Sequence, residues 1–166
     1  MNKSRILFID FGRRRSGLAI SDREKKLAFP SPPLVLSKRE SGKGEEIVRG
    51  IACLVNAKNY FLEEIIVGDP RLLNGKRSSF GEKVVQWTAY LHDYFPAIKI
   101  ILWDERFSSV QAERSLREMG KSRRERVQYT DSTAAALLLQ SYLDAKRESL
   151  HMNVAIPCVD ESLRLF

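Results

Sequence analysis

Residues 5–21 read RILFIDFGRRRSGLAIS, and this stretch predicts the first two strands of a sheet. An apolar run reaches Asp10, a basic turn follows around Gly12, and a second apolar run begins at Gly17. Two short apolar runs joined by a glycine-containing turn are typical of an antiparallel hairpin. The stretch therefore predicts two paired strands, with an acidic residue at the end of the first.

Outward from this hairpin, apolar strands alternate with helices. We expect a third extended piece around Pro30–Pro33 that ends near Leu36, strands over 64–68 and 99–104, and helices over 45–58, 79–95, 108–119 and 129–147. This order implies an α/β fold in which a leading antiparallel hairpin feeds a parallel sheet. Residues 1–148 are predicted to form one domain, and the tail over 149–166 has no clear period and stays unassigned.

The composition favours a polyanionic partner. Lys and Arg number 28 against 21 Asp and Glu, which gives a net charge of +7 and a pI near 9.6. A basic surface of this kind attracts nucleic acid, although a solvated surface without a partner is the plainer interpretation. No glycine-rich nucleotide loop of the usual spacing occurs, so a nucleoside triphosphate cradle is excluded.

The sequence predicts no association with a membrane. It contains no run of eighteen apolar residues, and Asp10 interrupts the apolar segment near the N-terminus that would otherwise resemble a signal peptide. The two cysteines, Cys53 and Cys158, are far apart and lack a CxxC spacing, as in proteins of a reducing compartment. We expect a cytoplasmic protein.

Acidic residues stand at three positions where a carboxylate is costly. Asp10 follows the first strand, Asp104 and Glu105 follow the strand over 99–104, and Asp131 opens an apolar helix. A buried carboxylate costs several kcal/mol unless it is hydrogen-bonded, paired or bound to a cation. Three of them in a basic chain suggest a hard metal ion that faces a phosphate backbone.

Each acid also has a structural interpretation. Asp10 is able to cap its own turn, and Asp104 or Glu105 to pair with Arg106 at the surface. Alternation places Asp104 and Glu105 on opposite faces of their strand, so only one of them can join Asp10. Asp131 taken alone is best interpreted as a helix N-cap or first-turn residue.

Basic residues cluster beside these acids. They lie in the turn after Asp10, before the helix over 79–95, beside Glu105 and before Asp131. Each cluster alone is most simply a solvated run, but together they suit the neutralisation of phosphates around a metal site. The predicted nucleic-acid contacts are Arg13, Arg14, Arg15, Lys76, Arg77, Arg106, Lys121, Arg123, Arg124 and Arg126.

At these residues the chain resembles the YqgF/RuvX family of RNase H-like proteins. The opening motif of that family, D-x-G-x-x-R-x-G-x-A-x-S-D, matches Asp10, Gly12, Arg15, Gly17, Ala19, Ser21 and Asp22. Its V-G-x-P motif with a later glycine matches Val67, Gly68, Pro70 and Gly75. Its D-E-R-x-[ST]-[ST] and D-x-x-A-A motifs match Asp104–Ser109 and Asp131–Ala135. The resemblance covers about residues 5–145 in order.

The resemblance implies an RNase H-like fold, with a mixed five-stranded sheet and helices on both faces. It also implies that Asp10, Glu105 and Asp131 form an acidic triad that holds one or two Mg²⁺ or Mn²⁺ ions. This implication revises the N-cap interpretation of Asp131 and selects Glu105 over Asp104.

Family members are described as pre-16S rRNA nucleases and, earlier, as Holliday junction resolvases. We therefore expect a metal-dependent hydrolase that cleaves structured RNA at the 5′ end of pre-16S rRNA during ribosome biogenesis. The alternative is resolution of branched DNA in recombination or repair. RNA trimming needs only a monomer, whereas paired cuts in a junction need a homodimer. An alternative of another class is a nucleic-acid-binding module without catalysis.

Overall fold

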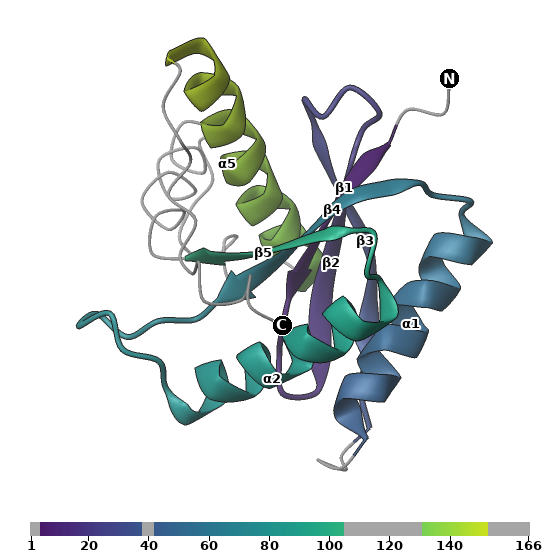
Figure 1. Ribbon diagram of the computed structural model, residues 1–166, viewed down its shortest axis with the longest axis vertical. Coiled ribbons are helices and arrows are strands. Elements are labelled where there is room, and N and C mark those ends of the chain that lie inside the picture. Colours follow the sequence, from purple (N-terminus) through teal and green to yellow (C-terminus); the bar gives the residue numbers. More distant parts are fainter. Residues whose placement is uncertain (1–3, 38–41, 105–130, 153–166) are drawn as a thin grey trace.

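The computed structural model describes residues 4–37, 42–104 and 131–152. In this part of the chain, five strands form one sheet in the order β3-β2-β1-β4-β5 (Figure 1). The strands are β1 (Arg5–Asp10), β2 (Arg15–Ser21), β3 (Ala28–Val35), β4 (Leu62–Asp69) and β5 (Lys99–Asp104). The helices are α1 (Lys43–Ala57), α2 (Ser79–Tyr94) and α5 (Asp131–Met152).

The sheet is mixed, as the sequence predicted. β2 pairs antiparallel with both β1 and β3, whereas β4 pairs parallel with β1, and β5 pairs parallel with β4. α1 connects β3 to β4 and α2 connects β4 to β5, so each helix links strands that run in the same direction. The predicted leading hairpin and parallel half of the sheet are both confirmed.

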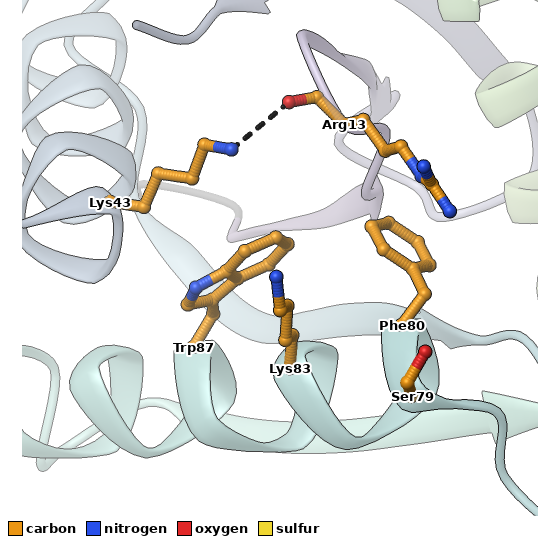
Figure 2. Close-up of a pocket in the computed structure, with 6 residues that line it drawn as sticks. All are labelled: Arg13, Lys43, Ser79, Phe80, Lys83 and Trp87. Atoms are coloured by element: carbon orange, nitrogen blue, oxygen red, sulfur yellow. Dashed lines mark hydrogen bonds between the residues drawn. The ribbon is translucent and has the colours of Figure 1, made fainter. Parts of the chain in front are cut away.

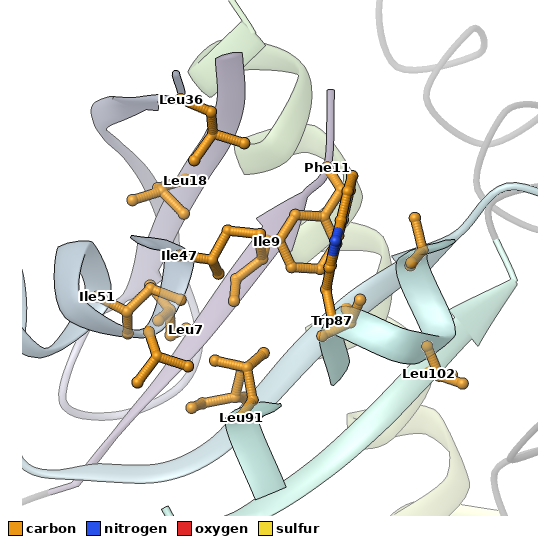
Figure 3. Packing of buried hydrophobic residues seen from close by; sticks show 14 of the residues in the cluster. Leu7, Ile9, Phe11, Leu18, Leu36, Ile47, Ile51, Trp87, Leu91 and Leu102 are labelled. Carbon is orange, nitrogen blue, oxygen red and sulfur yellow. The ribbon is translucent and has the colours of Figure 1, made fainter. Parts of the chain in front are cut away.

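Helices cover both faces of the sheet because successive side chains of a strand point to opposite faces. One apolar cluster joins the sheet to α1 and α2 (Figure 3), and it includes Leu7, Ile9, Phe11, Leu18, Ile47, Ile51, Trp87, Leu91 and Leu102. The other cluster joins the opposite face to α5, and it includes Ile6, Phe8, Ala19, Ile66, Trp103, Ala135, Leu139 and Tyr142. The expectation of helices on both faces is therefore confirmed.

The N-terminal part of α1 lies close against α2. A β-carbon on Gly44 would lie 2.3 Å from the ring of Tyr90, so only glycine fits at this contact without a shift of the ring. α2 begins after Ser78, whose hydroxyl oxygen accepts a 3.2 Å hydrogen bond from the Gly81 backbone N–H as an N-cap does. The Gly44 contact thus places the first turn of α1 against the C-terminal half of α2.

Most element bounds lie within two residues of the predicted ones. The strand over 99–104 has the predicted limits. The last helix extends to Met152, beyond the predicted end near 147, so the boundary proposed at residue 148 falls inside α5. The helix predicted over 108–119 lies outside the described residues, as does the part of the tail after residue 152.

The longest of the described helices is α5, with 22 residues. Its second half carries charged side chains, including Asp144, Lys146 and Arg147. Neither α5 nor either of the other two described helices is long and apolar enough to cross a bilayer.

Candidate active site

Three parallel strands end in acidic residues at one edge of the sheet. Asp10 closes β1, Asp69 closes β4 and Asp104 closes β5. Asp69 lies opposite Asp104 in the strand register, and Asp10 follows directly on the paired residues Ile9 and Val67. Open α/β sheets bind their ligands at the carboxyl ends of the parallel strands, so this carboxyl edge is the candidate site.

The acids at the carboxyl edge are divided between the two faces. Asp10 alternates in phase with Phe8, which packs against α5. Asp104 alternates in phase with Leu102, which packs on the side of α1 and α2. Asp104 therefore lies on the opposite face from Asp10, and its side chain is only 1% exposed. This placement removes Asp104 from a site built on Asp10, and the role of Glu105 stays a prediction.

The N-terminus of α5 lies at the same edge and on the same face as Asp10. Near the other end of the sheet, Glu64 accepts hydrogen bonds from Tyr142 Oη at 2.9 Å and Lys146 Nζ at 2.7 Å. The helix from Tyr142 back to Asp131 is about 16 Å long, and the strand from Glu64 to the end of β4 has about the same length. α5 thus crosses its face of the sheet (Figure 1), and its first residues lie toward the carboxyl edge.

The structure describes only part of the predicted acidic triad. Asp10 is half-buried, the backbone of α5 places Asp131, and Glu105 lies outside the described residues. Among the residues that are described, no three His, Cys, Asp or Glu side chains are grouped as metal ligands would be. The three-carboxylate metal site stays a prediction.

Glycines flank Asp10 within the sheet. Gly17 of β2 lies directly opposite Asp10, and Gly68 of β4 follows Val67, the partner of the residue before Asp10. Neither neighbour has a side chain, so backbone lines the α5 face on both sides of the carboxylate. Glycine at such a position allows a ligand to approach the sheet closely.

The turn after β1 depends on Gly12. A β-carbon there would lie 2.1 Å from the carbonyl oxygen of Arg15, a distance that no other residue tolerates without a backbone shift. The tight turn predicted near Asp10 is confirmed. It presents Arg13, Arg14 and Arg15 as exposed residues at the carboxyl edge.

Asp69 has a structural role that the sequence analysis did not assign. Its side chain is fully buried, and its oxygens accept hydrogen bonds from Arg71 Nε at 2.7 Å and from Arg77 Nε and Nη2 at 3.2 and 3.1 Å. These bonds close the base of the loop between β4 and α2, where Arg71 and Arg77 also form a β-bridge. Arg77, predicted as a nucleic-acid contact, thus has an acidic partner in the fold.

The other predicted basic contacts fall into two groups. Lys76 is exposed in the loop between β4 and α2, at the same end of the molecule as the Gly12 turn. Arg106 and the basic segment before Asp131, comprising Lys121, Arg123, Arg124 and Arg126, lie outside the described residues. Contact of either group with nucleic acid stays a prediction.

A basic pocket of about 140 Å³ lies at the carboxyl edge on the α1 and α2 side (Figure 2). It is lined by Arg13, Lys43, Ser79, Phe80, Lys83 and Trp87. Of these, only Arg13 was predicted from the sequence. Lys43 and Lys83 are separated in sequence from every motif, so only their proximity in the fold identifies them.

Comparison with known proteins supports the family that the motifs suggested. A model of the family described as "RuvX: Holliday junction resolvase" matches residues 4–145. A protein of Protochlamydia amoebophila named "Putative pre-16S rRNA nuclease" is 38% identical over 143 residues, covering 86% of this chain and 95% of its own. A protein of the same name from Thermoanaerobacter pseudethanolicus is 38% identical over 144 residues, covering 86% and 98%.

Among solved structures, the chain is similar to RuvC of Thermus thermophilus in complex with a Holliday junction substrate. The TM-score is 0.58 with 13% sequence identity, and the match covers 88% of this chain and 96% of that one. At this identity the likeness concerns the fold, and it confirms the predicted RNase H-like class. With the family model matched over nearly all of the sheet and its helices, the chain belongs to the RuvX family.

Proposed function

We propose that this chain is a divalent-metal-dependent nuclease that hydrolyses phosphodiester bonds in structured RNA and processes the 5′ end of pre-16S rRNA. The main support is the position of Asp10, which lies at the carboxyl edge of the sheet on the same face as the first residue of α5. The names of relatives 38% identical over nearly their whole length support the RNA substrate. The location in the cytoplasm stays a prediction.

Carboxylate oxygens are the ligands that Mg²⁺ and Mn²⁺ prefer, and the proposed donor set consists only of carboxylates. Asp10, Glu105 and Asp131 would hold one or two of these ions. When bound, the ions supply an activated water and stabilise the oxygen that leaves. The half-buried position of Asp10 beside two glycines fits such an ion, because the site is partly dry and its walls are backbone.

The remaining proposed roles belong to basic side chains and glycines. Arg15 at the start of β2 and Arg106 after β5 position the scissile phosphate, and Arg13 and Arg14 neutralise phosphates beside it. Gly17 and Gly68 leave space for the substrate backbone against the sheet. The chain would thereby bring a polyanion to a cluster of acids that would otherwise repel it.

Resolution of four-way DNA junctions is the second candidate, because the family itself carries that description. Junction resolution requires two symmetric cuts and therefore a homodimer, whereas RNA trimming can be performed by a monomer. Paired symmetric incisions in a junction, made by a dimer, would favour this candidate over RNA processing.

The test compares wild type with Asp10→Asn in Mn²⁺, on a labelled structured RNA that carries the 5′ flank of 16S rRNA and on a four-way junction. Asp93→Asn is the matched control, because Asp93 is exposed on α2 and the charge change is the same. We expect Asp10→Asn to lower the cleavage rate by at least about 10³-fold, or about 4 kcal/mol, with little change in stability. The control should cleave at the wild-type rate.

The outcomes separate the candidates. Cleavage of the RNA alone by wild type supports the proposed substrate, and loss in Asp10→Asn alone supports the proposed site. Cleavage at the wild-type rate by Asp10→Asn would refute the mechanism. Binding of nucleic acid without cleavage by wild type at millimolar Mn²⁺ would favour the non-catalytic module.

A further inference from the structure

The basic pocket is built by three separate parts of the chain. Arg13 comes from the turn after β1, Lys43 from the first turn of α1, and Lys83 from the exposed side of α2. In Figure 2 the Lys43 amine points to the backbone of Arg13, the Lys83 amine lies between the rings of Trp87 and Phe80, and the Arg13 side chain extends over Phe80. No acidic residue is among the described residues that line the pocket.

Lys43 connects the pocket to the core. Its side chain is 3% exposed, and its Nζ donates a 3.2 Å hydrogen bond to the carbonyl oxygen of Arg13. The same Nζ lies 5.8 Å from the centre of the Trp87 ring, within the range of a cation–π contact. Trp87 is held in turn by edge-to-face contacts with Phe11 and Phe80. The cationic wall of the pocket is therefore held in place by packing.

The chemistry of the pocket suits a phosphate group. Arg and Lys donors, a hydroxyl from Ser79 and the positive N-terminal end of a 16-residue helix are all groups that bind phosphate oxygens. A volume of about 140 Å³ holds such a group with a few waters, since a water in the liquid occupies about 30 Å³. The aromatic floor excludes water from one side and thereby strengthens the attraction between opposite charges.

A phosphate bound in this pocket would differ from the one that is proposed to be cleaved. Asp10 points to the α5 face, whereas the pocket opens on the α1 and α2 side. Arg13 follows Asp10 by three residues, so their Cα atoms are at most about 11 Å apart. Neighbouring phosphates on one strand of a duplex are further apart than their rise of about 3.4 Å along the helix axis, so this reach corresponds to about one or two phosphates.

We propose that this basic pocket binds a non-scissile backbone phosphate of the substrate, about one or two nucleotides from the scissile one. The inference rests on the proposed function in so far as the ligand is nucleic acid. It assigns Lys43 and Lys83, together with Arg13, to substrate binding. A strand held at both places would cross the carboxyl edge from one face of the sheet to the other.

Binding of a fluorescent structured RNA in EDTA tests the pocket without any cleavage. We compare wild type, Lys83→Ala and Lys58→Ala over a series of salt concentrations. Lys58 is an exposed lysine at the opposite end of α1, so its variant removes the same charge far from the pocket. We expect Lys83→Ala to weaken binding by about 3- to 10-fold and to reduce the salt slope by about one, with less than a twofold effect for Lys58→Ala.

Neutral methylphosphonate links, introduced at one phosphate at a time, identify the phosphate that is bound. Replacement of one particular non-scissile phosphate should weaken binding to wild type and have no further effect on binding to Lys83→Ala. The effects of removing the two partners of one contact do not add. Equal effects of Lys83→Ala and Lys58→Ala, or no position coupled to Lys83, would overturn the inference.

Failure of this inference is distinct from failure of the proposed nuclease. The nuclease depends on cleavage in Mn²⁺ and on Asp10, whereas the pocket depends on affinity in EDTA and on Lys83. Cleavage that needs Asp10, together with affinity that is indifferent to Lys83, would leave the nuclease and remove the pocket. Affinity that depends on Lys83, without cleavage that needs Asp10, would support the phosphate pocket and favour a binding module over a nuclease.

Discussion

The two faces of the sheet differ in charge where they meet the carboxyl edge. On the α5 face, Asp10 lies beside two glycines and the first residue of α5 is another acid, Asp131. On the other face, Arg13, Lys43 and Lys83 surround a pocket. The acidic face suits metal ions and chemistry, and the basic face suits affinity for phosphates. A single edge can therefore provide both functions to one strand of nucleic acid.

The contrast holds even though acids occur on both faces. Asp69, on the basic face, is fully buried and its charge is matched by Arg71 and Arg77. Alternation places Asp104 on that face as well, where its carboxylate is also buried. The position of an acid at a strand end is thus insufficient to identify a metal ligand. Its face decides.

The sharpest test of the two-face contrast compares Glu105→Gln with Asp104→Asn. The two acids are adjacent in sequence, but only one can share a face with Asp10. We expect Glu105→Gln to lower the cleavage rate by about 10³-fold, or about 4 kcal/mol, because it removes a proposed metal ligand. Asp104→Asn should retain the wild-type rate per folded molecule, measured in parallel with denaturant unfolding. A larger loss of rate in Asp104→Asn than in Glu105→Gln would contradict the proposal that the acidic site lies on the α5 face.

The sequence was sufficient to predict Asp10 on the acidic face, but it did not predict the pocket on the basic face. Strand ends, glycine spacing and the family motifs indicated Asp10, the mixed sheet and the tight turn at Gly12, because these depend on local patterns. Lys43 and Lys83 belong to no motif, and they become neighbours only when α1 and α2 pack together at Gly44. A pocket assembled from three separate segments leaves no periodic signal in the chain.

Buried ion pairs were also beyond the reach of sequence patterns. The Asp-Pro of the second motif gave no indication that Asp69 is fully buried, because its partner Arg77 lies eight residues later across a loop. Glu64 likewise appeared to be part of an ordinary strand, yet it accepts hydrogen bonds from Tyr142 and Lys146 of α5. Pairing across long separations depends on tertiary contacts, which local composition does not record.

The acid of the basic face should act on stability and not on chemistry. Asp69→Asn removes a buried charge that faces Arg71 and Arg77, whose side chains are 18% and 17% exposed. Breaking such a pair leaves uncompensated charge, and we expect a loss of about 3 kcal/mol in the free energy of unfolding. Urea denaturation measures this loss, with exposed Asp93→Asn as a control that should change stability by less than about 0.5 kcal/mol.

A loss of unfolding free energy in Asp69→Asn no larger than that of the control would show that Arg71 and Arg77 can be solvated at little cost when the carboxylate is removed. The loop between β4 and α2 would then not depend on this buried acid. The rate of cleavage per folded molecule gives the second readout. A fall of that rate comparable to the effect of Asp10→Asn would give Asp69 a role in chemistry and remove the proposed division between the faces.

The weakest expected effect belongs to Asp22, which shares the opening motif with Asp10 but lies at the other end of the hairpin. Its Oδ1 accepts hydrogen bonds from the backbone N–H groups of Lys26 and Leu27 at 2.7 and 3.1 Å, which shape the turn between β2 and β3. Partial burial acts to raise the pKa of Asp22, but the backbone hydrogen bonds outweigh burial and lower the pKa below its ordinary value of 3.8.

Because the pKa of Asp22 is lowered in the folded state, its ionised form stabilises the fold. That stabilisation is complete above pH 3.8 and is lost as the pH falls through the lower pKa of the folded state. Asp22→Asn should therefore cost about 0.5 kcal/mol or less at pH 7, since the group is largely solvated, and less still at pH 2, below the ordinary pKa of 3.8. Thermal unfolding at both pH values measures the difference. A loss of cleavage without this pH-dependent loss of stability would instead make Asp22 a second functional acid, far from the carboxyl edge.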